Sequence, residues 1–443
     1  MSQAVSTAKV MLWGTQVGAV TWVEEQSLGY FQYAFDFLSS GIELSPLIMP
    51  LAEAPYSYPA LPRDAFKGLP GLLADVLPDK FGNRLIDAWL AEDGRTPNSF
   101  TPVERLCYVG KRGMGALEFD PAIKPNANRS TEVDLSRLVN LANQVLDERS
   151  NLSGKLTGRG SAEALEDILQ VGTSAGGARA KAVLAWHPTT GEFRSGQLDA
   201  ELGFEHWLLK FDGVANNRDK ELADPLGFGL VEYAYHKMAV EAGITMMPCR
   251  IQEEGGRSHF MTKRFDRFVN EAGHADKMHV QTLAALQHYD FNDPNGYSYE
   301  QALLTIREIG LGNGALEEQF RRAIFNVLSR NQDDHVKNIA FLMDRNGEWS
   351  LSPAYDVTYS YNASGEWTSQ HQMSMNGKRD DFELDDLINF GRTAGLKPIK
   401  SKQVIESIAV AIGQWKKIAK TYGVDKKMAK QIARTHRTDL IFK

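Results

Sequence analysis

One run of eight mostly polar residues constrains the fold of this chain more than any other feature. The run is Asn331-Gln-Asp-Asp-His-Val-Lys-Asn338. It follows a segment with helical periodicity, 321–330, and precedes an apolar hairpin pattern, 339–351, whose turn is Asn346-Gly347. The fold must therefore place a dense set of polar side chains where a helix passes into a hairpin.

Spacing within this run points to phosphoryl transfer. Protein kinases place a catalytic aspartate and a metal-binding asparagine five residues apart. Asp333 and Asn338 have this spacing, whereas Asp334 is one residue too close, so the spacing selects Asp333 as the base. A second metal-binding carboxylate is expected after the hairpin, and Asp356 stands there, although Val357-Thr358 follows it in place of Phe-Gly.

Two other interpretations of this run stay open. Asp, Asn and Gln are common in solvated turns, so the run could be only a connection between a helix and a strand. Asp and His also bind zinc, which would suit a metal hydrolase. Against zinc, the chain has no His-Glu-x-x-His motif and its ten histidines are scattered.

Upstream segments supply the other parts that phosphoryl transfer needs. A strand pattern ends at Lys210, and a helical pattern, 229–241, contains Glu232, which could hold that lysine. The loop 171–181 is rich in Gly and Ala, so its backbone N–H groups could approach phosphates. It matches neither a Walker A loop nor the kinase Gly-x-Gly-x-x-Gly loop. Taken singly, the lysine and glutamate could be ordinary surface residues.

Composition describes an ordinary globular protein of about three domain lengths, with 443 residues, 43% hydrophobic and 24% charged. The formal charge is −7, which disfavours a surface that binds nucleic acid throughout. Cys107 and Cys249 fit neither a disulfide framework nor a zinc motif. The start has no signal-peptide pattern and no long apolar stretch occurs, so we expect a cytoplasmic protein with no membrane contact.

Taken in order, the motifs resemble one known family. They are the loop Ser174–Lys181, Leu208-Leu-Lys210, Thr262–Arg267, Asp333–Asn338 and Pro353–Asp356, preceded by Leu77-Pro-Asp79 and Gly110–Ala116. As a set they resemble the HipA family of bacterial serine/threonine kinases, the toxin half of HipA–HipB toxin–antitoxin systems. The similarity runs nearly from end to end.

The resemblance implies an α+β, two-lobed protein-kinase-like fold with a β-containing N-terminal subdomain and a mostly helical C-terminal lobe. We expect an N-terminal HipA-type subdomain over 1–125, after which a Pro- and Asn-rich linker begins. A kinase N-lobe with the phosphate loop would follow over 126–265, and a helical C-lobe with the catalytic loop over 266–443.

ATP and Mg²⁺ are the implied cofactors. Asp333 would be the catalytic base, Asn338 and Asp356 would hold Mg²⁺, and Lys210, supported by Glu232, would contact the ATP phosphates. The nucleotide site would further include Gly176, Gly177, Ala178, Arg179, Ala180 and Lys181 of the loop, Lys263, Arg264 and Phe265 of the hinge that meets adenine, and His335, Lys337 and Tyr355.

Ser174 matches the autophosphorylation serine of the family, with Thr173 beside it as an alternative. This chain departs from the best-known members at Arg179, where they have Gln, and at Asp334, where they have Gly. These departures bear on the contacts of the loop with the nucleotide and on the geometry of the base.

In the family, the substrate is an aminoacyl-tRNA synthetase, a translation-related host protein whose phosphorylation slows growth. The resemblance also implies a HipB-like DNA-binding antitoxin, with operator DNA reached mainly through that antitoxin. Two alternatives stay open: a catalytically weak co-repressor tethered to DNA, and a kinase of small molecules. The intact set Lys210, Asp333, Asn338 and Asp356 argues against the first.

The last thirty residues differ in charge from the rest of the chain. Residues 414–443 contain nine Lys and Arg against two Asp, a formal charge of +7, so the first 413 residues carry −14. Such a segment could attract a phosphate backbone. It could equally be the solvated face of an amphipathic terminal helix whose apolar face is Ile405, Ile408, Ile412, Trp415 and Ile418.

Overall fold

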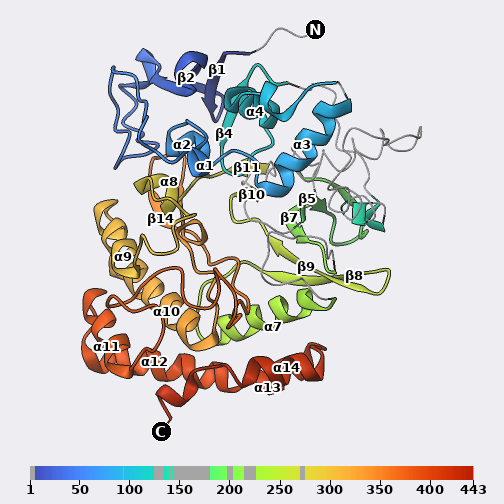
Figure 1. Cartoon of the computed structure of the whole chain (residues 1–443), viewed down its shortest axis with the longest axis vertical. Coiled ribbons are helices and arrows are strands. Elements are labelled where there is room, and N and C mark those ends of the chain that lie inside the picture. Colours follow the sequence, from blue (N-terminus) through green and yellow to red (C-terminus); the bar gives the residue numbers. More distant parts are fainter. Residues whose placement is uncertain are drawn as a thin grey trace.

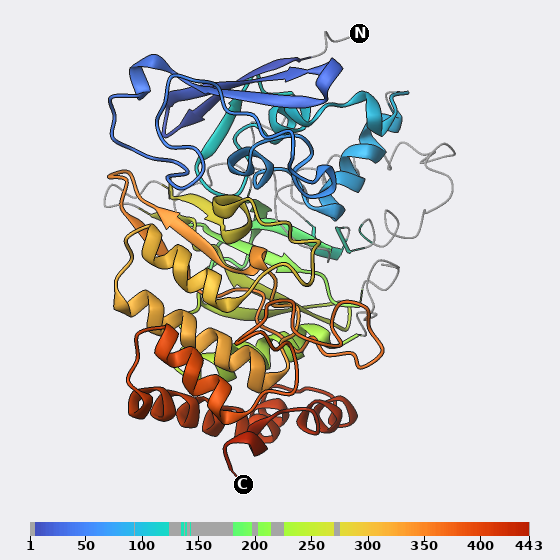
Figure 2. The same cartoon turned by 60° about the vertical axis from the view of Figure 1, so that its left-hand side comes forward.

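The computed structural model describes residues 5–92, 94–123, 134–136, 138–139, 142, 180–196, 203–213, 226–269 and 275–442. Figures 1 and 2 show three layers: an N-terminal part at the top, a sheet in the middle and a helical part at the bottom. The two termini therefore lie at opposite ends of the molecule. Among the described helices, none is both long and apolar enough to cross a membrane.

The N-terminal part contains an antiparallel sheet and several helices. Its strands, in the spatial order β3-β2-β1-β4, are β1 (Thr7–Leu12), β2 (Thr15–Val23), β3 (Leu28–Tyr33) and β4 (Leu117–Asp120). In β1 every second residue is buried, which is the pattern of a half-buried strand. The helices are α1 (Arg63–Phe66), α2 (Gly71–Ala74), α3 (Lys80–Glu92) and α4 (Pro102–Val109).

The middle layer is a five-stranded antiparallel sheet with one long helix against it. The strand order is β6-β5-β7-β9-β8, and the strands are β5 (Lys181–Trp186), β6 (Phe193–Ser195), β7 (Glu205–Lys210), β8 (Cys249–Glu254) and β9 (Arg257–Lys263). Helix α7 (Phe228–Glu241) packs on β8 and β9. The sequence predicted β7 and α7. It missed β8, whose residues are nearly all half-buried and show no alternation.

The C-terminal part, residues 267–442, is mostly helical, and its last helices form the bottom of the molecule (Figure 1). Its elements are β10 (Arg267–Val269), β11 (Ala275–Lys277), β12 (His279–Thr282), α8 (Leu283–Gln287), α9 (Tyr299–Glu308), α10 (Asn313–Ser329), β13 (Ala340–Met343), β14 (Trp349–Leu351), α11 (Leu384–Thr393), α12 (Pro398–Gly413), α13 (Trp415–Thr421) and α14 (Lys426–Ala433). The predicted hairpin is β13–β14, and the predicted helix before it begins eight residues earlier than expected, at Asn313.

The C-terminal segment forms three helices rather than one. The first helix ends at Gly413, and the second ends shortly before Gly423, which has a positive φ. The five apolar residues expected on its inner face are all buried. The α+β arrangement, an antiparallel sheet with α7 followed by a helical lobe, agrees with the predicted two-lobed fold. The domain limits at 125 and 265 stay predictions.

Candidate active site

Lys210 joins three elements that are far apart in the sequence. It is the last residue of β7, and its Nζ lies 2.5 Å from Oε1 of Glu232 on α7. The same Nζ contacts Oδ1 of Asp356, which follows the β13–β14 hairpin. The side chains of Lys210 and Glu232 are 7% and 2% exposed. A lysine this deeply buried requires carboxylate partners, because an unpaired ammonium would be costly to desolvate.

Asp356 is held in an unusual backbone conformation. Its φ is 52°, in the left-handed region that residues other than glycine rarely adopt. The preceding residues are fixed on both sides: the N–H of Ala354 donates to the carbonyl of Thr245 at 2.8 Å, and Tyr355 Oη donates to the carbonyl of Lys337 at 2.5 Å. Backbone strain of this kind persists only where surrounding contacts enforce it, and it is common at functional sites.

The polar run forms a tight loop between α10 and β13. The loop turns back through a short 3₁₀ helix, Val336–Asn338, and Nδ2 of Asn338 donates to the carbonyl of Asp333 at 2.7 Å. This hydrogen bond holds the side chain of Asn338 against the backbone of Asp333. The side chain of Asp333 is 56% exposed, and its Oδ1 lies 3.8 Å from Nε2 of His335. Asp333 is thus open to a reactant from outside.

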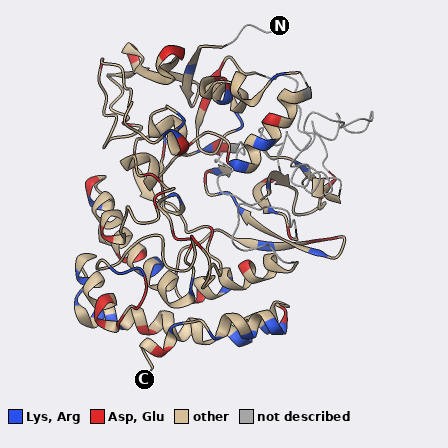
Figure 3. Cartoon of the chain, in the orientation of Figure 1, with Lys and Arg blue, Asp and Glu red and all other residues tan. Residues whose placement is uncertain are grey.

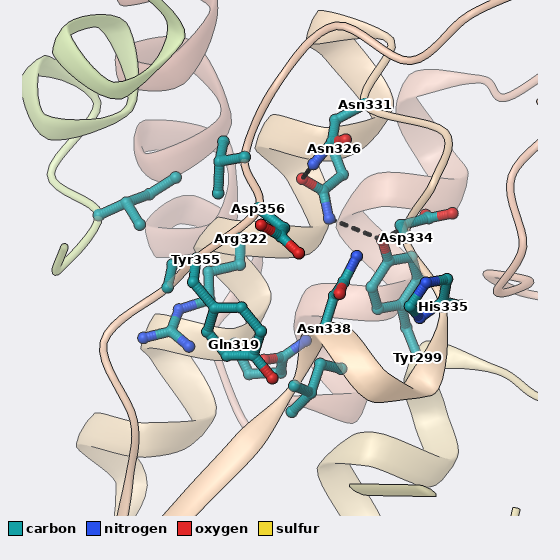
Figure 4. A pocket seen from close by; sticks show the side chains of 14 residues that line it. Tyr299, Gln319, Arg322, Asn326, Asn331, Asp334, His335, Asn338, Tyr355 and Asp356 are labelled. Carbon is teal, nitrogen blue, oxygen red and sulfur yellow. Dashed lines mark hydrogen bonds between the residues drawn. The ribbon is translucent and has the colours of Figure 1, made fainter. Parts of the chain in front are cut away.

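Asn338 and Asp356 face a common pocket. Figure 4 shows their side chains directed into the space between the loop, helix α10 and the segment after the hairpin. Gln319 and Asn331 line the same pocket, and Gln319 Oε1 and Asn331 Oδ1 are buried there without a hydrogen-bond partner. The pocket is therefore lined by amide and carboxylate oxygens, the donors that hard cations prefer.

Asp334 has a different role from its neighbour Asp333. It is buried, and it accepts hydrogen bonds from Tyr299 Oη, from Nδ1 of His371 at 2.6 Å and from the N–H of Gln372 at 2.7 Å. These donors hold the pKa of Asp334 below its usual value despite its burial. The loop is thereby tied to the 371–372 segment, whereas the side chain of Asp333 stays exposed.

Asp334→Asn should lower the free energy of unfolding by about 3 kcal/mol, since it removes charged hydrogen bonds in a buried site. Because the folded-state pKa of Asp334 is depressed, the contribution of its charge is complete above about pH 4 and is lost as the pH falls further. Urea unfolding of both proteins between pH 6 and pH 3 should show the difference shrinking toward acid. A difference that grows toward acid would contradict this assignment.

Two lysines other than Lys210 lie near the site, Lys181, which is buried, and Lys337, which is half-buried. Lys181 pairs directly with Lys210 across β5 and β7, and burial lowers its pKa. Burial also lowers the pKa of Lys337 in the loop, whose Nζ lies 4.2 Å from the ring centroid of Phe291. Burial raises the pKa of Asp79, in the N-terminal part, to about 7. The positive charges of Lys181 and Lys337 oppose this rise but do not cancel it. The N-terminal part thus contributes to the electrostatics of the site.

The segment expected to be the hinge follows β9. The N–H of Lys263 donates to the carbonyl of Pro248, and the N–H of Arg264 donates to that of His206, both at 2.9 Å. The ring centroids of Phe265 and Tyr355 are 5.5 Å apart. The guanidinium of Arg264 instead pairs with buried Asp266.

Comparison with known proteins identifies the family of this chain. A model of the HipA-like C-terminal domain matches residues 173–437, which is more than half of the chain. The chain belongs to the HipA family. A model of the HipA N-terminal domain matches residues 8–120.

One solved HipA structure shares the fold across almost the whole chain. It is the HipA–HipB–operator DNA complex of the Shewanella oneidensis MR-1 toxin–antitoxin system, 17% identical, with a TM-score of 0.67 over 98% of this chain and 96% of that one. The likeness shows the two-lobed α+β fold. The kinase CtkA of Helicobacter pylori covers 55% of this chain and 91% of its own at 13% identity, with a TM-score of 0.34, too low for a conclusion.

Among curated proteins, Y4mE of Sinorhizobium fredii, whose name describes a candidate kinase, is 23% identical over 126 residues. The matched region covers 27% of this chain and 30% of Y4mE.

Of the site residues predicted from the HipA motifs, the structure brings one group together. Lys210, Glu232 and Asp356 are in contact, Asn338 and His335 line the pocket with Asp356, and Lys181 and Tyr355 lie beside them. Buried Ala180 precedes β5. Ser174, Gly176, Gly177, Ala178 and Arg179 lie outside the described residues.

Sequence reasoning missed the partners of Asp334 and of Asp266. His371 and Gln372 lie 37 and 38 residues beyond Asp334, and their hydrogen bonds to it have no periodic signal in the sequence. For Asp266, the adjacent arginines Arg264 and Arg267 were a usable signal of a charged cluster.

Proposed function

We propose that this HipA-family chain is an ATP- and Mg²⁺-dependent protein kinase that phosphorylates serine or threonine. The contact of Lys210 Nζ with both Glu232 and Asp356 carries the proposal. It joins a strand lysine, a helix glutamate and an aspartate after a hairpin, the three parts that kinases use to hold the nucleotide phosphates and their metal. A surface lysine would not need two carboxylates in a buried position.

The residues present fit a magnesium ion. Mg²⁺ in phosphoryl-transfer sites is bound through one or two carboxylates or amide oxygens together with substrate phosphates. Asp356 and Asn338 offer one carboxylate and one amide on the same pocket, and Asp356 also contacts the lysine that would meet the phosphates. When bound there, Mg²⁺ would neutralise negative charge on the β- and γ-phosphates.

Each residue then has a role in transfer. Lys210 and Lys181 would hold the phosphates of ATP, and the backbone of Lys263–Phe265 would meet adenine. The exposed carboxylate of Asp333 would accept the proton of the incoming serine or threonine hydroxyl while its oxygen attacks the γ-phosphorus and the bond to the β-phosphate oxygen breaks, releasing ADP. Asn338 keeps the backbone of Asp333 in place through its amide N–H.

The HipA family suggests the biological setting of this activity. We infer that the chain is the toxin of a toxin–antitoxin module and modifies a translation-related host protein such as an aminoacyl-tRNA synthetase. Modification of Ser174 would add negative charge to the phosphate loop and so restrain the enzyme. A HipB-like antitoxin would be its partner. Lys416, Lys417, Lys420, Lys426, Lys427 and Lys430 are exposed on α13 and α14 (Figure 3), where they could lie near DNA held by that partner.

A transfer assay tests the proposed activity. Purified protein incubated with γ-labelled ATP and Mg²⁺ should incorporate label on Ser174, detectable as one phosphopeptide by mass spectrometry. Chelation of Mg²⁺ with EDTA should abolish labelling. Millimolar Mg²⁺–ATP should also raise the melting temperature, because a ligand that binds the folded state stabilises it. The proposal is overturned if no label appears on the protein or on added cell extract and Mg²⁺–ATP does not raise the melting temperature.

A further inference from the structure

The hinge segment is held from two sides. On one side, the backbone N–H of Arg264 donates to the carbonyl of His206 on β7, and the Phe265 ring packs near Tyr355. Among the described residues, the backbone N–H of Phe265 has no hydrogen-bond partner. A free N–H at this place would suit the edge of a nucleotide base. The opposite side of the segment contacts the N-terminal part.

Asp266 is the centre of that second side. Its carboxylate is fully buried and accepts hydrogen bonds from Arg264 Nε at 2.8 Å, Arg264 Nη2 at 2.7 Å and Arg267 Nη1 at 2.7 Å. A fourth hydrogen bond, at 2.7 Å, comes from the backbone N–H of Gly115, 151 residues earlier in the chain. The two guanidinium groups hold the pKa of Asp266 far below its usual range, so it is charged at every physiological pH.

The N-terminal segment Gly113–Gly115 completes the cluster with its carbonyls. Arg267 donates to the carbonyls of Gly113 and Gly115, each at 3.0 Å, and Arg264 donates to Gly113 at 3.4 Å. These bonds supply the acceptors that two buried arginines need beyond one carboxylate. The motif Gly110–Ala116 thus binds directly to the residues that follow β9.

Gly115 is suited to this approach. Its φ is +77°, a conformation that favours glycine, and a Cβ there would lie 3.1 Å from the backbone nitrogen of Val280. At Gly113, a Cβ would lie 3.0 Å from Cγ1 of Val76 and 3.1 Å from Cγ1 of Val109, so the segment is also closely packed within the N-terminal part.

We propose that the N-terminal part of this protein positions the nucleotide hinge, with the Gly113–Gly115 segment acting through Asp266. Asp266 is a positioning residue: it touches no substrate but fixes Arg264 and, through the adjoining backbone, Phe265. The inference rests on the proposed function, since it assumes that the Lys263–Phe265 segment meets adenine. It assigns the N-terminal part a direct role in nucleotide affinity.

Asp266→Asn tests this role by isothermal titration calorimetry. Its dissociation constant for Mg²⁺–ATP should rise at least tenfold, whereas that for Mg²⁺–tripolyphosphate, which has no base to meet the hinge, should stay within twofold of wild type. Arg267→Lys, a milder change that loses the paired bonds to Gly113 and Gly115, should raise the ATP constant about threefold and serves if Asp266→Asn does not fold.

Trp13→Phe is the matched control. It removes a different bond between the N-terminal part and the rest, from Trp13 Nε1 to the carbonyl of Lys277 at 2.7 Å, and should leave both constants unchanged. The inference is overturned if the Asp266 and Arg267 variants bind ATP like wild type, or if tripolyphosphate binding weakens equally. If wild type itself binds no ATP, the proposed function fails instead.

Discussion

Asp333→Asn should reduce phosphoryl transfer by about 10²- to 10⁴-fold while leaving Mg²⁺–ATP binding nearly unchanged. The substitution keeps the shape of the side chain but removes the carboxylate that would accept the proton of the attacking hydroxyl. Asp333 is largely exposed, and no described ion pair to lysine or arginine depends on its charge, so the fold should tolerate the change. Initial rates with γ-labelled ATP and thermal shifts with Mg²⁺–ATP measure the two effects separately.

Asp385→Asn is a suitable control, because Asp385 is an exposed residue in the first turn of α11, outside the site. Its rate should match that of wild type. Comparable rates for Asp333→Asn and wild type would remove Asp333 from the mechanism. If Asp333→Asn lost both phosphoryl transfer and ATP binding, Asp333 would instead be needed for nucleotide binding or for folding.

Lys210→Met should abolish labelling and also destabilise the protein by about 3 kcal/mol. Methionine fills a similar volume but leaves Glu232, which is 2% exposed, as a buried carboxylate without its cation. Breaking one side of a buried ion pair typically costs 3–5 kcal/mol for this reason, and Asp356, at 28% exposed, can turn partly to water. Urea unfolding at neutral pH measures the loss.

The double variant Lys210→Met/Glu232→Gln separates stability from function. Replacing the carboxylate of Glu232 by an amide should recover part of the lost stability, since a neutral amide costs less to bury than a charged carboxylate. Labelling should stay absent, because Lys181 would be left as the only one of the two proposed phosphate-binding lysines, without the lysine that contacts Asp356. Full stability in Lys210→Met alone would contradict the buried ion pair, and restored labelling in the double variant would contradict the role of Lys210.

The sequence predicted best what is encoded locally. Strand β7 and helix α7 are local segments rich in apolar residues, so their positions were predicted closely, and with them the places of Lys210 and Glu232. The order of the motifs predicts that Asp333, Asn338 and Asp356 belong to one site, and the structure places Asn338 and Asp356 on one pocket. Strand β8 was missed because its residues show no alternation of buried and exposed positions. It forms a strand through its antiparallel pairing with β9.

Long-range contacts could not be predicted in this way. The hydrogen bonds of Asp334 to His371 and of Asp266 to Gly115 join residues 37 and 151 positions apart. Neither pair leaves a pattern in the sequence, because each depends on how whole layers pack. The consequence for function is specific: the loop that contains Asp333 is anchored to the following loop, and the segment after β9 is anchored to the N-terminal part.

The most direct test of the central claim, that the chain phosphorylates a protein, is phosphoproteomic mass spectrometry of host cells after a short pulse of expression. Wild type should produce at least one new phosphoserine or phosphothreonine on a host protein, a translation factor or synthetase by our account, and cells expressing Asp333→Asn should lack it. Growth arrest by wild type with no new protein phosphorylation, or the same new phosphosites with Asp333→Asn, would contradict the account.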